Sequence, residues 1–128
     1  MGAPEFNFGK AEITAFNEAV AAGTFSISAD AAEQAKREYD LMITELNKLQ
    51  RKLDALTRAS GFGGFQSAQE LQSGFIGKAT EGKAVIEKLI DAASQLQVAY
   101  LRAGKQLAEA DQINADRLKR ITDDVQNG

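Results

Sequence analysis

Apolar residues recur at alternating intervals of three and four along one stretch of this chain, and this spacing restricts its fold more than any other feature. The stretch runs from Ala32 to Leu56 and contains neither proline nor glycine. In an α-helix of 3.6 residues per turn, such spacing places the apolar side chains on one stripe about seven turns long. Charged residues such as Glu38 and Lys48 lie between them. The pattern predicts a long amphipathic helix over about residues 29–59, which needs another helix to cover its stripe.

A turn and a longer second helix are predicted after this stretch. Residues 60–65 read Ser-Gly-Phe-Gly-Gly-Phe, and the glycines favour the positive φ values of a tight reversal. A second apolar series predicts a helix over about residues 66–125. Glycines at 74, 77 and 82 each lower helix propensity by about 1 kcal/mol, so a kink is expected at 74–82. The expected packing seam between the two helices consists of Tyr39, Met42, Leu46, Leu49, Leu53, Leu56, Leu89, Leu96 and Leu107.

The amino-terminal residues 7–27 predict a short extra helix and a connector. The helix is expected from Lys10 to Ala22, with Gly23 as its stop, and Ser28 or Asp30 is expected to cap the helix that follows. Residues 1–6 read Met-Gly-Ala-Pro-Glu-Phe and resemble the remnant of a cloning site, so they are set aside. The hairpin domain is therefore placed at residues 28–128.

One hairpin leaves part of the predicted apolar surface uncovered. Ile90, Val98 and Leu101 lie on a second face, beside the stripe of the longer helix. Either the amino-terminal helix folds back over this face or a second chain supplies the missing helices, and we favour the second chain. The expected fold is all-α: a long antiparallel helical hairpin with a short extra amino-terminal helix, completing a four-helix bundle by dimerisation.

Composition excludes several classes of function. The chain has no cysteine, no histidine and no tryptophan, which removes disulfides, thiol nucleophiles and imidazole chemistry. Its net charge of −3 disfavours nucleic acid as a partner. We find no apolar run of about 20 residues and no signal peptide. Acidic residues near the carboxy terminus alternate with Lys and Arg and are interpreted as a solvated face. We expect no catalytic residue, no cofactor and no metal site, and hence no enzyme.

The amphipathic helix, the turn and the longer helix together resemble the small Trp-x-Gly proteins of type VII (ESX) secretion in actinobacteria and their secretion-associated relatives. The resemblance covers about residues 28–128, and Phe62-Gly63-Gly64, followed by Phe65, stands where the family has Trp-x-Gly. The family also carries a Tyr-x-x-x-Asp/Glu export signal. In this chain Tyr100 is followed four residues later by Gly104. The nearest matching segment is Leu107 to Asp111, with Glu109 inside it.

This resemblance implies a non-enzymatic helical protein that forms a homodimer or a heterodimer with a related hairpin. It also implies recognition by a secretion ATPase or a chaperone, and a secreted or cell-surface location reached without a signal peptide. Two alternatives stay open: a cytosolic scaffold or adaptor whose long helix binds a target helix, and the helical leader domain of a larger secreted toxin that continues beyond Gly128. The two phenylalanines of the turn are interpreted either as a structural cap or as a docking point.

Overall fold

The computed structural model describes residues 9–127, with side chains described up to residue 123, and it confirms the all-α fold class. This part of the chain forms four helices and no strand. The interpretation of residues 1–6 lies outside the described residues. The helices are α1 (Lys10–Ala21), α2 (Ala29–Leu56), α3 (Gln66–Ala103) and α4 (Leu107–Asn127).

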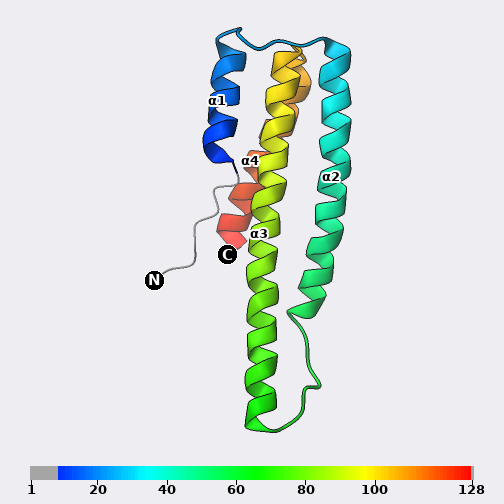
Figure 1. Ribbon diagram of the computed structural model, residues 1–128, viewed down its shortest axis with the longest axis vertical. Helices are drawn as coiled ribbons and strands as arrows, with labels where there is room; N and C mark the ends of the chain where they lie inside the picture. The colour runs from blue at the N-terminus through cyan, green and yellow to red at the C-terminus, as the bar shows by residue number, and fades with distance from the viewer. Residues whose placement is uncertain (1–8, 128) are drawn as a thin grey trace.

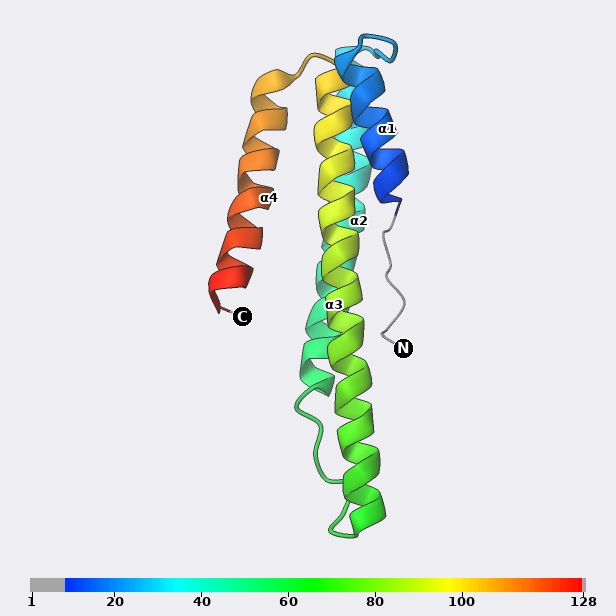
Figure 2. The same cartoon turned by 90° about the vertical axis from the view of Figure 1, so that its left-hand side faces the viewer.

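Helix α3 is the central element, and each of the other three helices packs against it. Helices α2 and α3 form the expected antiparallel hairpin (Figure 1). A quarter turn of the view shows α1 and α4 on different sides of α3, both beside its carboxy-terminal half (Figure 2). The four helices therefore run alternately up and down, and one chain supplies all of them.

Helix α2 begins where its capping residue predicts. The Ser28 hydroxyl oxygen accepts a hydrogen bond from the Ala31 amide at 3.1 Å, and it thereby satisfies one of the free amides of the first turn. Of the two residues proposed as the cap, Ser28 occupies that position and Asp30 lies in the first turn, where its charge complements the helix dipole.

The best-covered part of the core lies where α2, α3 and α4 meet. Ala32, Val98, Leu101 and Ala110 are buried together, and Ile27 and Ile113 pack against them. Burial of a side chain as large as Leu101 stabilises the fold by about 2 kcal/mol. Ile90, Val98 and Leu101 were expected to need a second chain, but they are buried by the chain's own helices. That expectation was wrong, because it did not include a separate α4 that turns back along α3.

The predicted single helix over residues 66–125 is divided in two at Gly104, which corrects the expected boundary. Lys105 has a φ of 61°, and its amide donates to the Arg102 carbonyl at 3.0 Å, while the Gln106 amide donates to the Leu101 carbonyl at 2.8 Å. These two bonds form the Schellman motif that ends many helices. A Cβ atom on Gly104 would overlap the Ala32 methyl group and lie 3.2 Å from the Ser28 carbonyl oxygen. Only glycine fits this close approach to the start of α2.

No break occurs at residues 74–82, where the kink was expected. Helix α3 is continuous through all three glycines there. Gly74 and Gly77 face open space, and a Cβ on Gly82 would lie 3.2 Å from a Leu53 methyl carbon. The propensity cost of these glycines is local and small, so the packing of α3 against α2 outweighs it.

Aromatic rings join α1 to the hairpin. The Phe16 ring lies 4.9 Å from the Phe25 ring and 5.0 Å from the Tyr100 ring, and the Tyr39 ring lies 6.0 Å from that of Tyr100. This cluster brings together α1, the connector after it, α2 and α3. The described part of the amino-terminal region, residues 9–27, is thus tied to the hairpin by aromatic packing.

Candidate helix-packing interface

The predicted packing seam divides into two sets along α2. Tyr39, Leu46 and Leu53 are half-buried, as are Leu89 and Leu96 on α3. Met42, Leu49 and Leu56 instead have exposed fractions of 49%, 44% and 41%. The two sets share one predicted stripe but have different surroundings.

The reason for this division is the side of α2 that faces α3. Ile43, Gln50 and Thr57, one position beyond each exposed residue, are half-buried. Contact with α3 is therefore centred beside Tyr39, Leu46 and Leu53, at one edge of the predicted stripe, and the exposed residues form its other edge. We call Met42, Leu49 and Leu56 the α2 stripe. These residues recur every seven positions, so they form an apolar ridge along α2.

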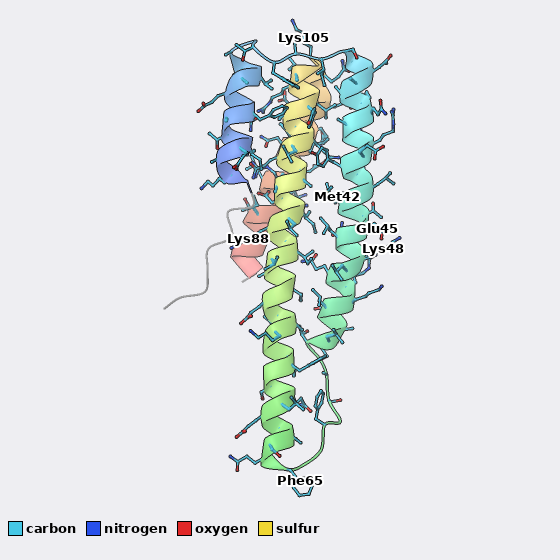
Figure 3. The ribbon with its side chains drawn as sticks, in the orientation of Figure 1. Met42, Glu45, Lys48, Phe65, Lys88 and Lys105 are labelled. Atoms are coloured by element: carbon cyan, nitrogen blue, oxygen red, sulfur yellow. The ribbon has the colours of Figure 1, made fainter. Side chains whose placement is uncertain are left out.

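Charged side chains border the α2 stripe on its outer side. Glu45 and Lys48 project from the outer edge of α2, whereas Met42 lies nearer to α3 (Figure 3). The Lys48 ammonium lies 3.2 Å from a Glu45 carboxylate oxygen. Glu38, Glu45 and Lys52 are also spaced by seven residues and are all exposed. An apolar ridge with a charged border is the usual composition of a helix that pairs with another helix.

The turn motif places its two phenylalanines in different environments. Gly61 and Gly63 have φ values of 82° and 114°, so the expected positive φ is present at both. The φ of Gly64 is not positive. The Phe62 ring lies 5.8 Å from the Phe75 ring of α3. Phe65 is 81% exposed at the end of the hairpin (Figure 3). Phe62 thus packs beside α3 with 36% of its surface exposed, and Phe65 is the more exposed of the two.

Helix α3 continues beyond the end of α2, and sequence reasoning missed the apolar residues of this extension. Leu71 and Phe75 have exposed fractions of 65% and 41%. The signal was present, because Leu71, Phe75 and Ala79 recur at intervals of four and so lie on one face of α3. Only Ala79 among them is buried.

The candidate export segment is separated by the break after α3. Tyr100 lies in α3 within the aromatic cluster, whereas Leu107, Glu109 and Asp111 lie in the first turns of α4. Leu107 is 58% exposed and Asp111 is exposed. The structure does not bring Tyr100 and Asp111 onto one face of one helix.

Glu109 instead takes part in the contact between α2 and α4. One of its carboxylate oxygens lies 3.5 Å from the Lys36 ammonium, and this oxygen is buried without a hydrogen-bond partner among the described groups. A side-chain hydrogen bond with Glu109, with burial and the charge of Glu109 as smaller causes, raises the pKa of Glu33. Two carboxyl groups that share a site favour retention of a proton.

Neither the described surface nor known proteins point to a chemical site. No group of three acidic side chains is placed to hold a metal ion within the described residues. An open groove of about 600 Å³ is lined by residues of all four helices, among them Ile90, Asp91 and Arg120. Asp91 pairs there with the Arg117 guanidinium at 3.0 Å.

None of the helices between residues 9 and 127 is both long and apolar enough to span a bilayer.

Comparison with known proteins gives no family. No protein-family model, no curated protein and no solved structure matches the chain. A function must therefore be argued from the surface itself.

Proposed function

We propose that this protein is a non-enzymatic helical interaction module that pairs with another helical hairpin through the α2 stripe. The observation that carries the proposal is the exposure of Met42, Leu49 and Leu56, at 49%, 44% and 41%, along about four turns of one helix. Each of these side chains would stabilise a complex by removing apolar surface from water. Leu46, Leu53, Leu89 and Leu96 are half-buried on the hairpin and would extend the surface that a partner helix covers.

We further propose that the module is a substrate of type VII secretion. Support comes from the turn residues Phe62, Gly63 and Gly64 between two long antiparallel helices, and from Phe65 exposed at the tip. Leu107 and Asp111 are exposed on the first turns of α4, where a secretion ATPase or chaperone would reach them. The chain would then act by helix-face recognition, without catalysis and without a cofactor.

The experiment for export expresses the chain in an actinobacterial host with and without a working type VII ATPase. Culture filtrate and cell lysate are then assayed for the protein. ATPase-dependent appearance in the filtrate, without markers of lysis, is the expected result. Retention in the lysate of both strains would overturn the export proposal.

The experiment for pairing compares two substitutions on different faces of α2. Leu49→Asp changes the α2 stripe, and Leu41→Asp changes a side chain that is 64% exposed outside it. Both variants should keep the helical circular dichroism of the parent chain, because both sites are open to water. We expect Leu49→Asp to lose association with a hairpin partner and Leu41→Asp to retain it. Equal behaviour of the two variants would contradict a role for the stripe.

A second candidate function is a cytosolic scaffold, and one observation favours it. Helix α3 extends beyond α2 and exposes Leu71 and Phe75, a surface suited to a target helix. Leu71→Asp separates the two functions. It should abolish target binding by a scaffold and leave pairing through the α2 stripe intact.

A further inference from the structure

Helices α3 and α4 enclose a cleft along the second half of α4. The two helices are close together where α4 begins and separate toward its carboxy-terminal end (Figure 2). Ile121 follows Ala110 by about three turns, so both side chains lie on the same face of α4. Ala110 is fully buried, whereas Ile121 is 38% exposed and lines the open groove of about 600 Å³ together with residues between 84 and 95 of α3. The inner face of α4 is therefore partly uncovered at this end.

We propose that this α3–α4 cleft binds an acidic amphipathic helix of another protein. The site goes beyond pairing through the α2 stripe, because it lies on a different face of the molecule. Asn47 and Gln50 are the residues of α2 that line the cleft. Asn47 lies about 160° around the helix from Leu49 of the α2 stripe. The two surfaces can therefore be changed independently.

Charge at the cleft favours an acidic partner. The charged residues of its lining are Lys10, Glu87, Lys88, Asp91 and Arg120. Asp91 is shared between the Arg117 guanidinium at 3.0 Å and the Arg120 guanidinium at 3.9 Å. Lys10 and Lys88 are exposed, and neither has an ion pair among the described residues. Cations thus predominate here on a chain whose net charge is −3, and a positive cleft attracts and orients carboxylates.

The floor of the cleft suits a helix. Ala84, Lys88 and Ala92 recur at intervals of four and so lie on one face of α3. Helices α1 and α4 lie on different sides of α3 and do not pack against each other within the described chain (Figure 2). The two alanine methyl groups allow another helix to approach α3 closely.

The partner's two faces would meet different parts of the cleft. Its apolar face would cover Ala84, Ala92 and Ile121, which are exposed or half-buried. Lys88 lies on the side of α3 turned away from α2 (Figure 3). From there its ammonium group would pair with carboxylates at the edge of the partner's apolar face, and Arg120 would do the same from α4. An amphipathic helix with acidic edges therefore matches both the apolar surface and the charge of the cleft.

A designed peptide tests the proposal. The probe is a fluorescent peptide of about four helical turns with leucine on one face and glutamate on the others, and fluorescence anisotropy gives its dissociation constant. The expected result is a saturable complex that weakens as the salt concentration rises. A peptide with lysine in place of each glutamate should not bind. Equal binding of both peptides, or no binding of the acidic one, would overturn the proposal.

Charge reversals locate the peptide on the surface. Lys88→Glu and Arg120→Glu should each raise the dissociation constant about tenfold, because each places a negative charge against the peptide's carboxylates. Lys119→Glu is the matched control, since it makes the same change of net charge at an exposed residue of α4 that does not line the cleft. Circular dichroism verifies that all three variants keep the helical fold. Equal weakening by Lys119→Glu would assign the binding to overall charge and overturn the site.

The position of the leucines tests the helical form of the ligand. A peptide of the same composition with its leucines spread over all faces should bind at least about tenfold more weakly, because it cannot place an apolar ridge in the cleft. Equal binding of the two acidic peptides would overturn the amphipathic helix as the ligand.

Variants of the two surfaces separate this inference from the proposed function. Leu49→Asp should lose association with a hairpin and keep the peptide, whereas Lys88→Glu should lose the peptide and keep the hairpin. Loss of the peptide in Leu49→Asp would overturn the cleft as its site. Light scattering tests a second copy of the chain as the occupant. Self-association that Lys88→Glu abolishes would overturn the acidic helix of another protein as the partner.

Discussion

Two adjacent residues, Gly104 and Lys105, decide where the chain turns back from α3 into α4. Gly104 lies against Ala32 and the Ser28 carbonyl with no space for a side chain, and Lys105 has a φ of 61°, which side chains disfavour. The Schellman hydrogen bonds of the turn hold this conformation. Substitutions at the two positions should therefore change stability in opposite directions.

Gly104→Ala should destabilise the fold by about 1–3 kcal/mol, because the new methyl group overlaps Ala32 and forces α2 and α3 apart. Denaturant unfolding followed by circular dichroism measures the change. Gly77→Ala is the matched control. It adds the same methyl group to an open helical position and should stabilise the fold by about 1 kcal/mol. Equal stability of the Gly104→Ala variant and the parent chain would contradict the close approach at Gly104.

Lys105→Gly should stabilise the fold by roughly 1 kcal/mol, because glycine adopts a positive φ without the steric cost that lysine has. The same unfolding experiment detects the change as a higher midpoint with an unchanged slope. A lower midpoint would show that the Lys105 side chain contributes more than its backbone conformation costs.

At the scale of elements, polar contacts fix how the helices are aligned. The Gln97 side chain is buried and donates to the Lys36 carbonyl at 2.9 Å and to an Asp40 carboxylate oxygen at 2.7 Å. The Lys83 ammonium donates to Asp54 at 2.7 Å farther along the hairpin. These contacts set the register between α2 and α3. The contact between α2 and α4 differs, because it brings two acidic groups together at Glu33 and Glu109.

The acidic contact makes the attachment of α4 dependent on pH. The pKa of Glu33 is raised in the folded chain, first by its hydrogen bond with Glu109. The folded state therefore holds this proton more tightly than the unfolded state does. The stability that the protonated Glu33 adds to the fold is fully present below the ordinary pKa of 4.5. It is lost as the pH rises through the raised pKa.

Glu33→Gln should remove the loss of folding stability at high pH, because the glutamine amide donates a hydrogen bond to Glu109 at any pH. We expect the melting temperature of the variant to exceed that of the parent chain at pH 7 and to match it at pH 4. Thermal melts across that range test the prediction, and Glu38→Gln, an exposed site on the same helix, is the control. An identical pH profile for parent and variant would mean that the hydrogen bond with Glu109 does not raise the pKa of Glu33.

At the scale of the whole molecule, the protection of backbone amides against hydrogen exchange is expected to be uneven. The buried residues of α3 concentrate between Ile86 and Ala103, where the other helices pack around it. Leu118 and Ile121 in the second half of α4 are 48% and 38% exposed, and the connector at 57–65 is largely exposed. Local opening should therefore begin in these two regions.

Hydrogen exchange should show slow amides in the carboxy-terminal half of α3 and faster ones in residues 118–123. The fold without a partner should also exchange faster along the α2 stripe than the proposed complex with another hairpin. Measurements of the parent chain and the Leu49→Asp variant give the comparison. Uniform protection across all four helices would contradict the central role of α3.

Several elements were predictable from the sequence because their signals are local. The three-four spacing over α2, the Ser28 cap and the glycine-rich turn each act within a few residues, and each lies where it was expected. The candidate interface was predictable only in part. A stripe shows which side of a helix is apolar, but it does not show which edge of the stripe meets the neighbouring helix. In the structure the edge that contains Leu46 faces α3, so Leu46 is half-buried and Met42 and Leu49 are exposed.

The sequence by itself therefore determined the all-α class, the hairpin and the apolar stripe, since helix propensity and periodicity are short-range properties of the chain. The tertiary structure alone decided that α3 ends at Gly104 and not at the glycines of 74–82, because only Gly104 lies against another helix with no space for a side chain. It also decided that α4 covers the face of Val98 and Leu101. Burial depends on what packs against a residue, and that partner is distant in the sequence.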